Sequence, residues 1–203
     1  MMISKDRYNS VFRQFLLSLC IFLLAAAYPG ETGAATNRGV YFEDEIIIGS
    51  RQLSLHGIGL LKWKYLVNVY LVGLYKPAEV PVDQVLQDVP KSLEFYFFVD
   101  MKAKDFKDTG LKLMSQNVGA EKANSLLTEL EKFNSFYRDV SAGQRYVFTY
   151  IPGQGIEMTL EEEVLGKVES DAFAAAYMSI WLGPVPVSKS LQEGLFNPAT
   201  RME

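Results

Sequence analysis

Cysteine and histidine are almost missing from this chain, and their scarcity excludes several kinds of chemistry. The 203 residues include one cysteine, Cys20, and one histidine, His56. A single cysteine forms no internal disulfide and no thiolate metal cluster. A single histidine excludes a His-rich metal site, and any catalytic triad would have to use His56. We therefore expect no metal and no cofactor, and we interpret His56 as a hydrogen-bonded residue at a strand end.

Basic residues are fewer than acidic ones. The chain has 20 basic and 24 acidic residues, which gives a net charge of -4. It contains no stripe of basic residues interleaved with aromatic ones. An acidic surface of this kind repels the phosphate backbone. We therefore expect no nucleic-acid partner.

The sequence has no comfortable membrane-spanning run, which would need about 20 apolar residues. Its N-terminal apolar run, Phe15 to Ala27, follows three basic residues and precedes the small residues Gly33, Ala34 and Ala35. This layout is typical of a secretory signal peptide. We predict a signal peptide over residues 1–35 and a mature domain over 36–203, located in the periplasm or secreted. Cleavage would change the net charge to -5. An uncleaved segment would supply the only membrane contact.

Apolar residues are plentiful, at 49% of the chain, and a single core is expected from 203 residues. The segment from Leu55 to Pro77 has the most informative pattern, and we predict that it forms one long buried strand. Side chains alternate between the two faces of a strand. One face is then apolar, and the other carries Asn68 and Tyr70, whose polar groups need partners from the protein or from a ligand. The apolar face consists of Trp63, Tyr65, Val67, Val69, Leu71 and Tyr75.

The rest of the chain alternates between strand and helix patterns. Strands are predicted over Ile46–Ile48, Leu93–Val99, Tyr146–Ile151, Ile156–Glu161 and Val164–Val168. Helices are predicted over Lys104–Val118, over Ala120–Val140, after the N-cap Ser170 as far as Gly183, and once more near the end of the chain. This order indicates an α+β domain with an antiparallel sheet covered by helices on one face. Gly57 and Gly59 lack the spacing of a dinucleotide-binding loop, and we predict a turn or a close backbone approach there.

Two segments resemble the chalcone isomerase-like family, in what we take to be a bacterial exported branch. They are NVYLVGLY, from Asn68 to Tyr75, and IWLGPVPV, from Ile180 to Val187. The resemblance extends over roughly Tyr41 to Phe196. It implies an open-faced β-sandwich with a ligand cleft between the sheet and the helices.

The same resemblance directs attention to the residues that would perform catalysis. The family's arginine lies just before the long strand, where this chain reads HGIGLLKWK and has no arginine between Arg51 and Arg138. Lys62 is the candidate for that position. Tyr70 corresponds to the family's threonine and Asn117 to its asparagine, while the family's tyrosine has no counterpart here. The loss of the arginine argues against ring closure, which needs a cation beside the developing enolate.

We therefore predict a ligand-binding site formed by Lys62, Asn68, Tyr70 and Asn117. An ammonium group at one end of an aromatic pocket would suit an amphipathic carboxylate or a phenol. The alternative is that Lys62 is a surface cation and that the other three are buried polar residues paired within the protein.

Three functions follow from these observations. The first is an exported, non-catalytic protein that binds a small hydrophobic or amphipathic ligand, such as a fatty acid. The second is an intramolecular lyase that closes a ring as chalcone isomerase does, using Lys62 in place of arginine. The third is an interaction module of the cell envelope, for which acidic surface patches are the only support.

Overall fold

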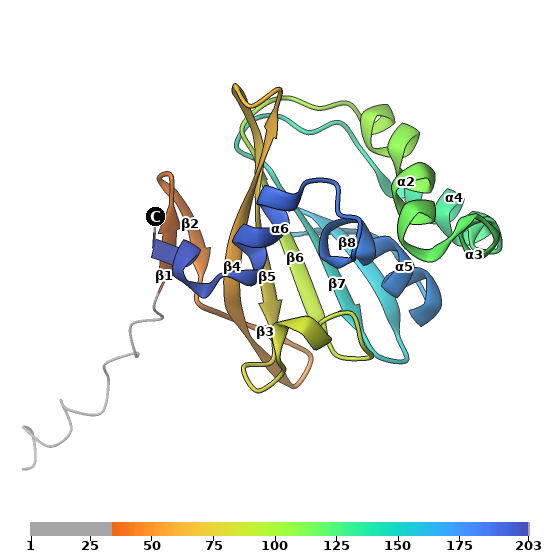
Figure 1. Cartoon of the computed structure of the whole chain (residues 1–203), viewed down its shortest axis with the longest axis horizontal. Coiled ribbons are helices and arrows are strands. Elements are labelled where there is room, and N and C mark those ends of the chain that lie inside the picture. The colour runs from red at the N-terminus through yellow and green to blue at the C-terminus, as the bar shows by residue number, and fades with distance from the viewer. Residues whose placement is uncertain (1–33, 203) are drawn as a thin grey trace, which may run out of the picture. The chain divides into compact units, whose positions relative to one another are not determined.

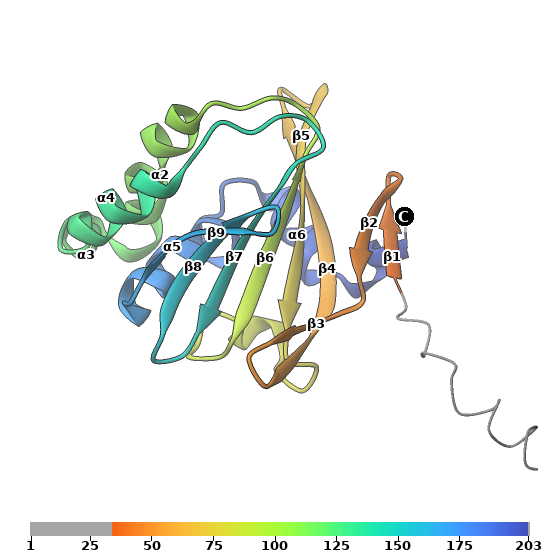
Figure 2. The ribbon, with the colours of Figure 1, turned by 180° about the vertical axis from the view of Figure 1, so that it is seen from behind.

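A seven-stranded antiparallel sheet forms the frame of the domain (Figures 1 and 2). The computed structural model describes residues 34–202, which lie in one compact unit. The predicted signal peptide, apart from its last two residues, lies outside the described residues. Strand order in the sheet follows chain order, so each strand pairs with the next. The strands are β3 (Glu45–Ile48), β4 (Arg51–Trp63), β5 (Val67–Lys76), β6 (Lys91–Phe97), β7 (Arg145–Ile151), β8 (Gly155–Leu160) and β9 (Glu163–Val168).

The helices cover one face of this sheet, as predicted. Helix α5 packs on β8, α6 packs on β4, and α4 packs on β9, while α2 lies against α5. Figure 2 shows the same sheet from its other side, with α5 and α6 behind it. No helix among residues 34–202 is both long and apolar enough to cross a membrane. The helices are α2 (Ala103–Val118), α3 (Ala120–Asn124), α4 (Leu127–Phe136), α5 (Asp171–Leu182) and α6 (Lys189–Phe196), with short 3₁₀ turns η1 (Val82–Gln84) and η2 (Pro198–Met202).

A small second sheet lies beside the first. It pairs β1 (Ala34–Asn37) with β2 (Val40–Glu43) and brings Ala35 opposite Phe42. Both residues are buried, in a hydrophobic cluster on the face of β4 and β5 that the helices leave free. Since Ala35 is part of this cluster, a signal-peptide cut after residue 35 would fall inside β1.

The prediction of one long strand from Leu55 to Pro77 is wrong. The chain reverses at Lys64–Leu66, so that β4 and β5 form a hairpin closed by a 3.1 Å hydrogen bond from the Leu66 amide to the Trp63 carbonyl. Lys64 and Tyr65 occupy the left-handed region, with φ values of 49° and 62°. Such turns ordinarily carry Asn or Gly. Here the alternating pattern continues through the turn, which hides it in the sequence.

The second predicted helix is also two elements rather than one. Helix α3 ends at Asn124, α4 runs from Leu127 to Phe136, and the chain is extended from Tyr137 onward. The extension allows Val140 and Met101 to exchange two backbone hydrogen bonds of 2.9 Å. That pairing cannot form if the helix continues to Val140.

The glycines of β4 let α6 approach the strand closely, which confirms one of the two predicted explanations. A Cβ atom on Gly57 would lie 2.6 Å from the carbonyl oxygen of Gly194, and one on Gly59 would collide with the carbonyl of Leu191. His56 directly precedes Gly57, inside β4 rather than at its end, and its Nε2 is 3.3 Å from the Phe196 carbonyl oxygen. Burial lowers the pKa of His56. His56 therefore helps to join β4 to the C-terminal segment.

Candidate ligand-binding site

A cavity of about 230 Å³ lies between the sheet and helices α2 and α5. Its walls are built by strand alternation and helical spacing. On β6 and β7, residues two apart point to the same face, and on α5 residues three and four apart do so. The cavity is lined by Leu61, Tyr70, Phe95, Phe97, Met101, Asp105, Phe106, Thr109, Gly110, Leu113, Tyr137, Tyr146, Phe148, Tyr177, Ile180, Trp181 and Val187.

Aromatic rings make most of this lining, and they pack against one another. The rings of Phe106 and Tyr137 stack with centres 4.8 Å apart, and those of Phe95 and Trp181 meet edge to face at 5.1 Å. Pairs of this kind add stability beyond the area they bury. The walls are therefore apolar and held in place by their own contacts.

Tyr70 contributes a hydroxyl group to the cavity. It accepts a 3.0 Å hydrogen bond from the indole N–H of Trp181, and burial raises its pKa to about 12. Among residues 34–202 no acceptor receives the proton of this hydroxyl. A bound ligand with an oxygen acceptor would satisfy it.

The hydroxyls of Tyr137 and Tyr177 also leave a proton without an acceptor in the described part of the chain. The Tyr137 and Tyr177 oxygens are 2.6 Å apart, and burial raises the pKa of both side chains. One hydroxyl donates to the other, so one proton of the pair remains available. Tyr146 differs, because its hydroxyl accepts from the Arg138 amide at 2.8 Å and donates to the Arg138 carbonyl at 2.9 Å.

The lining contains no basic side chain. Its only carboxylate, Asp105, is exposed, and it accepts a 3.0 Å hydrogen bond from the Lys102 amide at the start of α2. Within residues 34–202, no three His, Cys, Asp or Glu side chains gather where they could hold a metal ion. Stabilisation of an anion inside the cavity would rest on neutral hydrogen-bond donors, chiefly tyrosine hydroxyls.

The mouth of the cavity is formed by residues that solvent reaches. Leu61 at the end of β4, Met101, Leu113 on α2 and Val187 are half-buried, and Thr109 is exposed. The opening therefore lies between α2 on one side and the end of β4 with the α5–α6 connection on the other.

The four residues predicted from the sequence are not brought together. Tyr70 lines the cavity, but Lys62, Asn68 and Asn117 do not. Neighbouring residues of a strand point to opposite faces, and because Leu61 points inward, Lys62 points outward and is exposed. Asn68 is separated from Tyr70 by a bulge, since Leu61 pairs with Tyr70 and Lys62 with Asn68. The expected ammonium group at one end of the pocket is therefore absent from the lining.

Asn117 connects α2 to the turn after α5. Its amide group donates to the Val185 carbonyl at 2.9 Å and to the Leu113 carbonyl at 3.1 Å, and its oxygen accepts from the Val185 amide at 2.9 Å. All three bonds are internal to the protein. They match the alternative that this residue is a paired structural amide.

Sequence reasoning did not identify Trp181, Tyr137 and Tyr177 as site residues. A signal was present on α5, where Tyr177 and Trp181 are the only side chains with polar atoms on the face that also carries Ile180. The pairing of Tyr137 with Tyr177 spans 40 residues and left no local trace in the sequence.

Comparisons with known proteins agree with this architecture. A family model described as chalcone isomerase-like matches residues 34–197. Among solved structures, a fatty-acid-binding protein of Arabidopsis thaliana superposes with a TM-score of 0.65 at 16% identity, covering 83% of this chain and 98% of its own. That likeness establishes a shared fold. No curated protein matches the sequence significantly.

Proposed function

Because the chain belongs to the chalcone isomerase-like family, we propose that its cavity binds a small hydrophobic or amphipathic ligand, such as a fatty acid, without catalysis. The observation that carries this proposal is an aromatic cavity that opens to solvent and contains tyrosine hydroxyl protons with no acceptor in the described protein. The Arabidopsis neighbour, which is a fatty-acid-binding protein, supports the choice of ligand class. On the strength of the predicted signal peptide, we propose that this binding takes place in the periplasm or outside the cell.

The size and chemistry of the cavity restrict the ligand. A volume of about 230 Å³ is below the ~300 Å³ at which pockets for drug-sized molecules begin. A medium-length acyl chain therefore fits better than a long one, unless its end emerges at the mouth. An ionised carboxylate without a cation is costly to bury. We propose that a fatty acid binds in its protonated form, with its oxygens accepting from Tyr70 and from the Tyr137–Tyr177 pair.

The lyase alternative receives no support from this geometry. Ring closure requires a positive charge beside the oxygen that becomes negative. Lys62, the candidate for that role, is exposed and outside the lining. The binding function requires no such charge.

Native mass spectrometry tests the proposal. The delipidated chain from Ala34 onward is incubated with a mixture of fatty acids, and a one-to-one complex is expected. Gly110→Leu should reduce the complex at least tenfold, because a side chain there projects toward Tyr177 in the cavity wall. Gln116→Leu adds the same side chain at an exposed position of α2 and is the matched control. No complex with the unsubstituted chain, or equal loss in both variants, would overturn the proposal.

A further inference from the structure

The tip of the β4–β5 hairpin, residues 62–67, exposes a concentrated apolar surface. The exposed fractions are 92% for Tyr65, 87% for Leu66, 59% for Trp63 and 42% for Val67. The other exposed large apolar residues of the described chain are separated along the sequence. Contiguous exposed apolar surface commonly marks a site of interaction with another body.

Local turn chemistry does not account for these residues. Lys64 and Tyr65 occupy left-handed backbone positions at which Asn and Gly fit best. Bulky side chains are disfavoured there, and strained positions of this kind concentrate at functional segments. The residues at the tip are therefore consistent with a role of their exposed side chains in binding.

The charge at the tip is positive, in contrast to the acidic chain as a whole. Lys62 and Lys64 are both exposed, and the Lys64 ammonium lies 4.4 Å from the centre of the Trp63 ring. No Asp or Glu occurs from residue 51 to residue 78. On the connection into α2, Asp100 accepts from the Ala142 amide, and in the first turn of α2, Asp105 accepts from the Lys102 amide.

We propose that this hairpin tip docks on the surface of an anionic phospholipid bilayer. Trp and Tyr side chains favour the interface between headgroups and acyl chains, Leu66 and Val67 supply apolar area, and the two lysines meet anionic headgroups. Leu61 lines the cavity mouth and directly precedes the tip. Docking would therefore place the cavity mouth beside the membrane. Exchange of ligand between cavity and membrane rests on the proposed function, whereas docking of the tip is independent of it.

Vesicle flotation tests the docking. The chain from Ala34 onward is mixed with vesicles of equal phosphatidylglycerol and phosphatidylcholine, and with phosphatidylcholine alone. Each lysine near an anionic surface contributes about 1 kcal/mol, so Lys62→Gln with Lys64→Gln should weaken binding to the anionic vesicles roughly 30-fold. Leu66→Ser should weaken it at least tenfold. Ile47→Ser is the matched control, because Ile47 is 79% exposed on β3, which pairs with the opposite end of β4.

Brominated acyl chains supply a second measurement. They should quench the exposed Trp63 and leave the buried Trp181 unaffected. Absence of vesicle binding, or equal binding by the tip variants and the unsubstituted chain, would overturn the proposal. The proposal would also be overturned if analytical ultracentrifugation without vesicles showed a dimer that Leu66→Ser converts to a monomer, since the tip would then bind a second copy of the chain. Fatty-acid binding in solution is measured on the same variants, so that failure of docking is distinguished from failure of the proposed function.

Discussion

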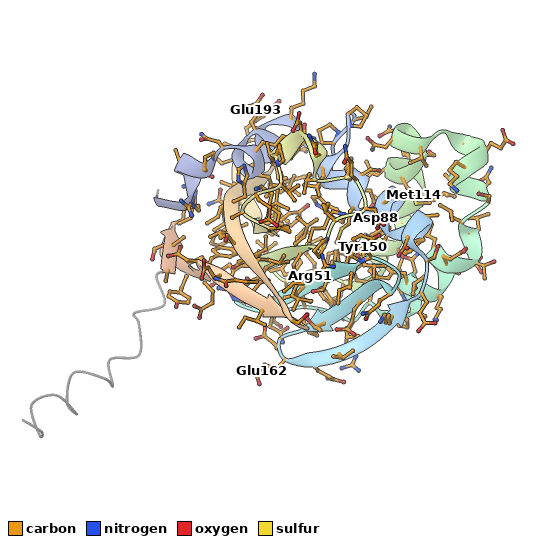
Figure 3. The ribbon with its side chains drawn as sticks, turned by 90° about the horizontal axis from the view of Figure 1, so that it is seen from below. Arg51, Asp88, Met114, Tyr150, Glu162 and Glu193 are labelled. Carbon is orange, nitrogen blue, oxygen red and sulfur yellow. The ribbon has the colours of Figure 1, made fainter. Side chains whose placement is uncertain are left out.

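The Lys91 ammonium lies 4.2 Å from the centre of the Tyr150 ring, where β6 and β7 meet at the end far from the cavity mouth. Lys91 is almost fully buried and donates to the Gln87 carbonyl at 3.1 Å. The Tyr150 hydroxyl donates to Asp88, which Figure 3 labels beside it. Burial lowers the pKa of Lys91 to about 8, and the opposing influence of Asp88 and Asp171 is smaller.

Lys91 should make the protein more stable as the pH rises from 8 to 9.5. In this interval an unfolded lysine, with a pKa near 10.4, still binds a proton that folded Lys91 releases. The free energy of unfolding should therefore increase with pH, and Lys91→Met should remove the increase. Urea unfolding at half-unit pH steps measures this, with Lys122→Met as an exposed control. A flat profile for the unsubstituted protein would contradict the prediction. The buried tyrosines act at higher pH, since the raised pKa of Tyr70 costs stability only above pH 10.

Gly110 stands in the middle of α2 and lines the cavity. A Cβ atom there would lie 3.5 Å from Leu130 and 3.7 Å from Tyr177, which are ordinary packing distances. Gly110→Ala should stabilise the protein by about 0.5–1 kcal/mol, because alanine is the better helix former. The same methyl group should reduce affinity for the bulkiest ligands. Thermal unfolding and ligand titration on the same sample measure both effects. A loss of stability would show that the methyl group does not fit at this position.

Fatty-acid affinity should rise as the pH falls through the ordinary carboxyl range of about 4 to 5, because the protonated acid avoids the cost of an unpaired buried charge. The corresponding fatty alcohol has no charge and should bind equally at pH 4.5 and pH 7. Isothermal titration at both values measures this, with circular dichroism to verify folding. Affinity that increases toward neutral pH would indicate a cation in contact with the ligand.

Tyr70→Phe removes one hydroxyl and leaves the ring. Loss of a hydrogen bond to the ligand costs about 0.5–1.5 kcal/mol, so fatty-acid affinity should fall roughly three- to tenfold. The indole N–H of Trp181 loses its acceptor at the same time, so stability should also fall. Displacement of a fluorescent fatty acid measures the affinity. Affinity that stays unchanged would show that Tyr70 only holds Trp181.

Asn117→Ala separates the structural from the ligand-binding interpretation of that residue. The substitution leaves the Val185 amide and carbonyl without their partners. Val185 is exposed, so water can replace the lost partner, and we expect a loss of about 0.5–1.5 kcal/mol in unfolding free energy and little change in ligand affinity. Gln116→Ala, at the exposed neighbouring position, is the control. If affinity falls while stability is retained, Asn117 contacts the ligand.

Much of the fold followed from local patterns. The four strands β6 to β9, of which β7 and β8 show alternation in the sequence, and the Ser170 cap of α5, whose hydroxyl accepts from the Phe173 amide at 3.2 Å, were predicted correctly. Where prediction failed, the decisive interaction was not local. The Lys64–Tyr65 turn has no Gly or Asn, and the end of α4 depends on the pairing of Val140 with Met101.

The site shows the same division more sharply. Alternation established that Leu61 and Lys62 face opposite ways, but the register of β4 against β5 decided that Leu61 faces the cavity. A single residue of slip would exchange them. The resemblance pointed to Tyr70, while the long-range pairing of Tyr137 with Tyr177 had no sequence signal.

From the sequence alone came the class of the domain, its acidic charge and the scarcity of metal ligands, because composition and periodicity require no knowledge of long-range contacts. The resemblance of two segments added the family. The tertiary structure decided which side chains share a cavity and which face solvent. Those outcomes depend on strand register and on contacts between residues as far apart as Tyr70 and Trp181.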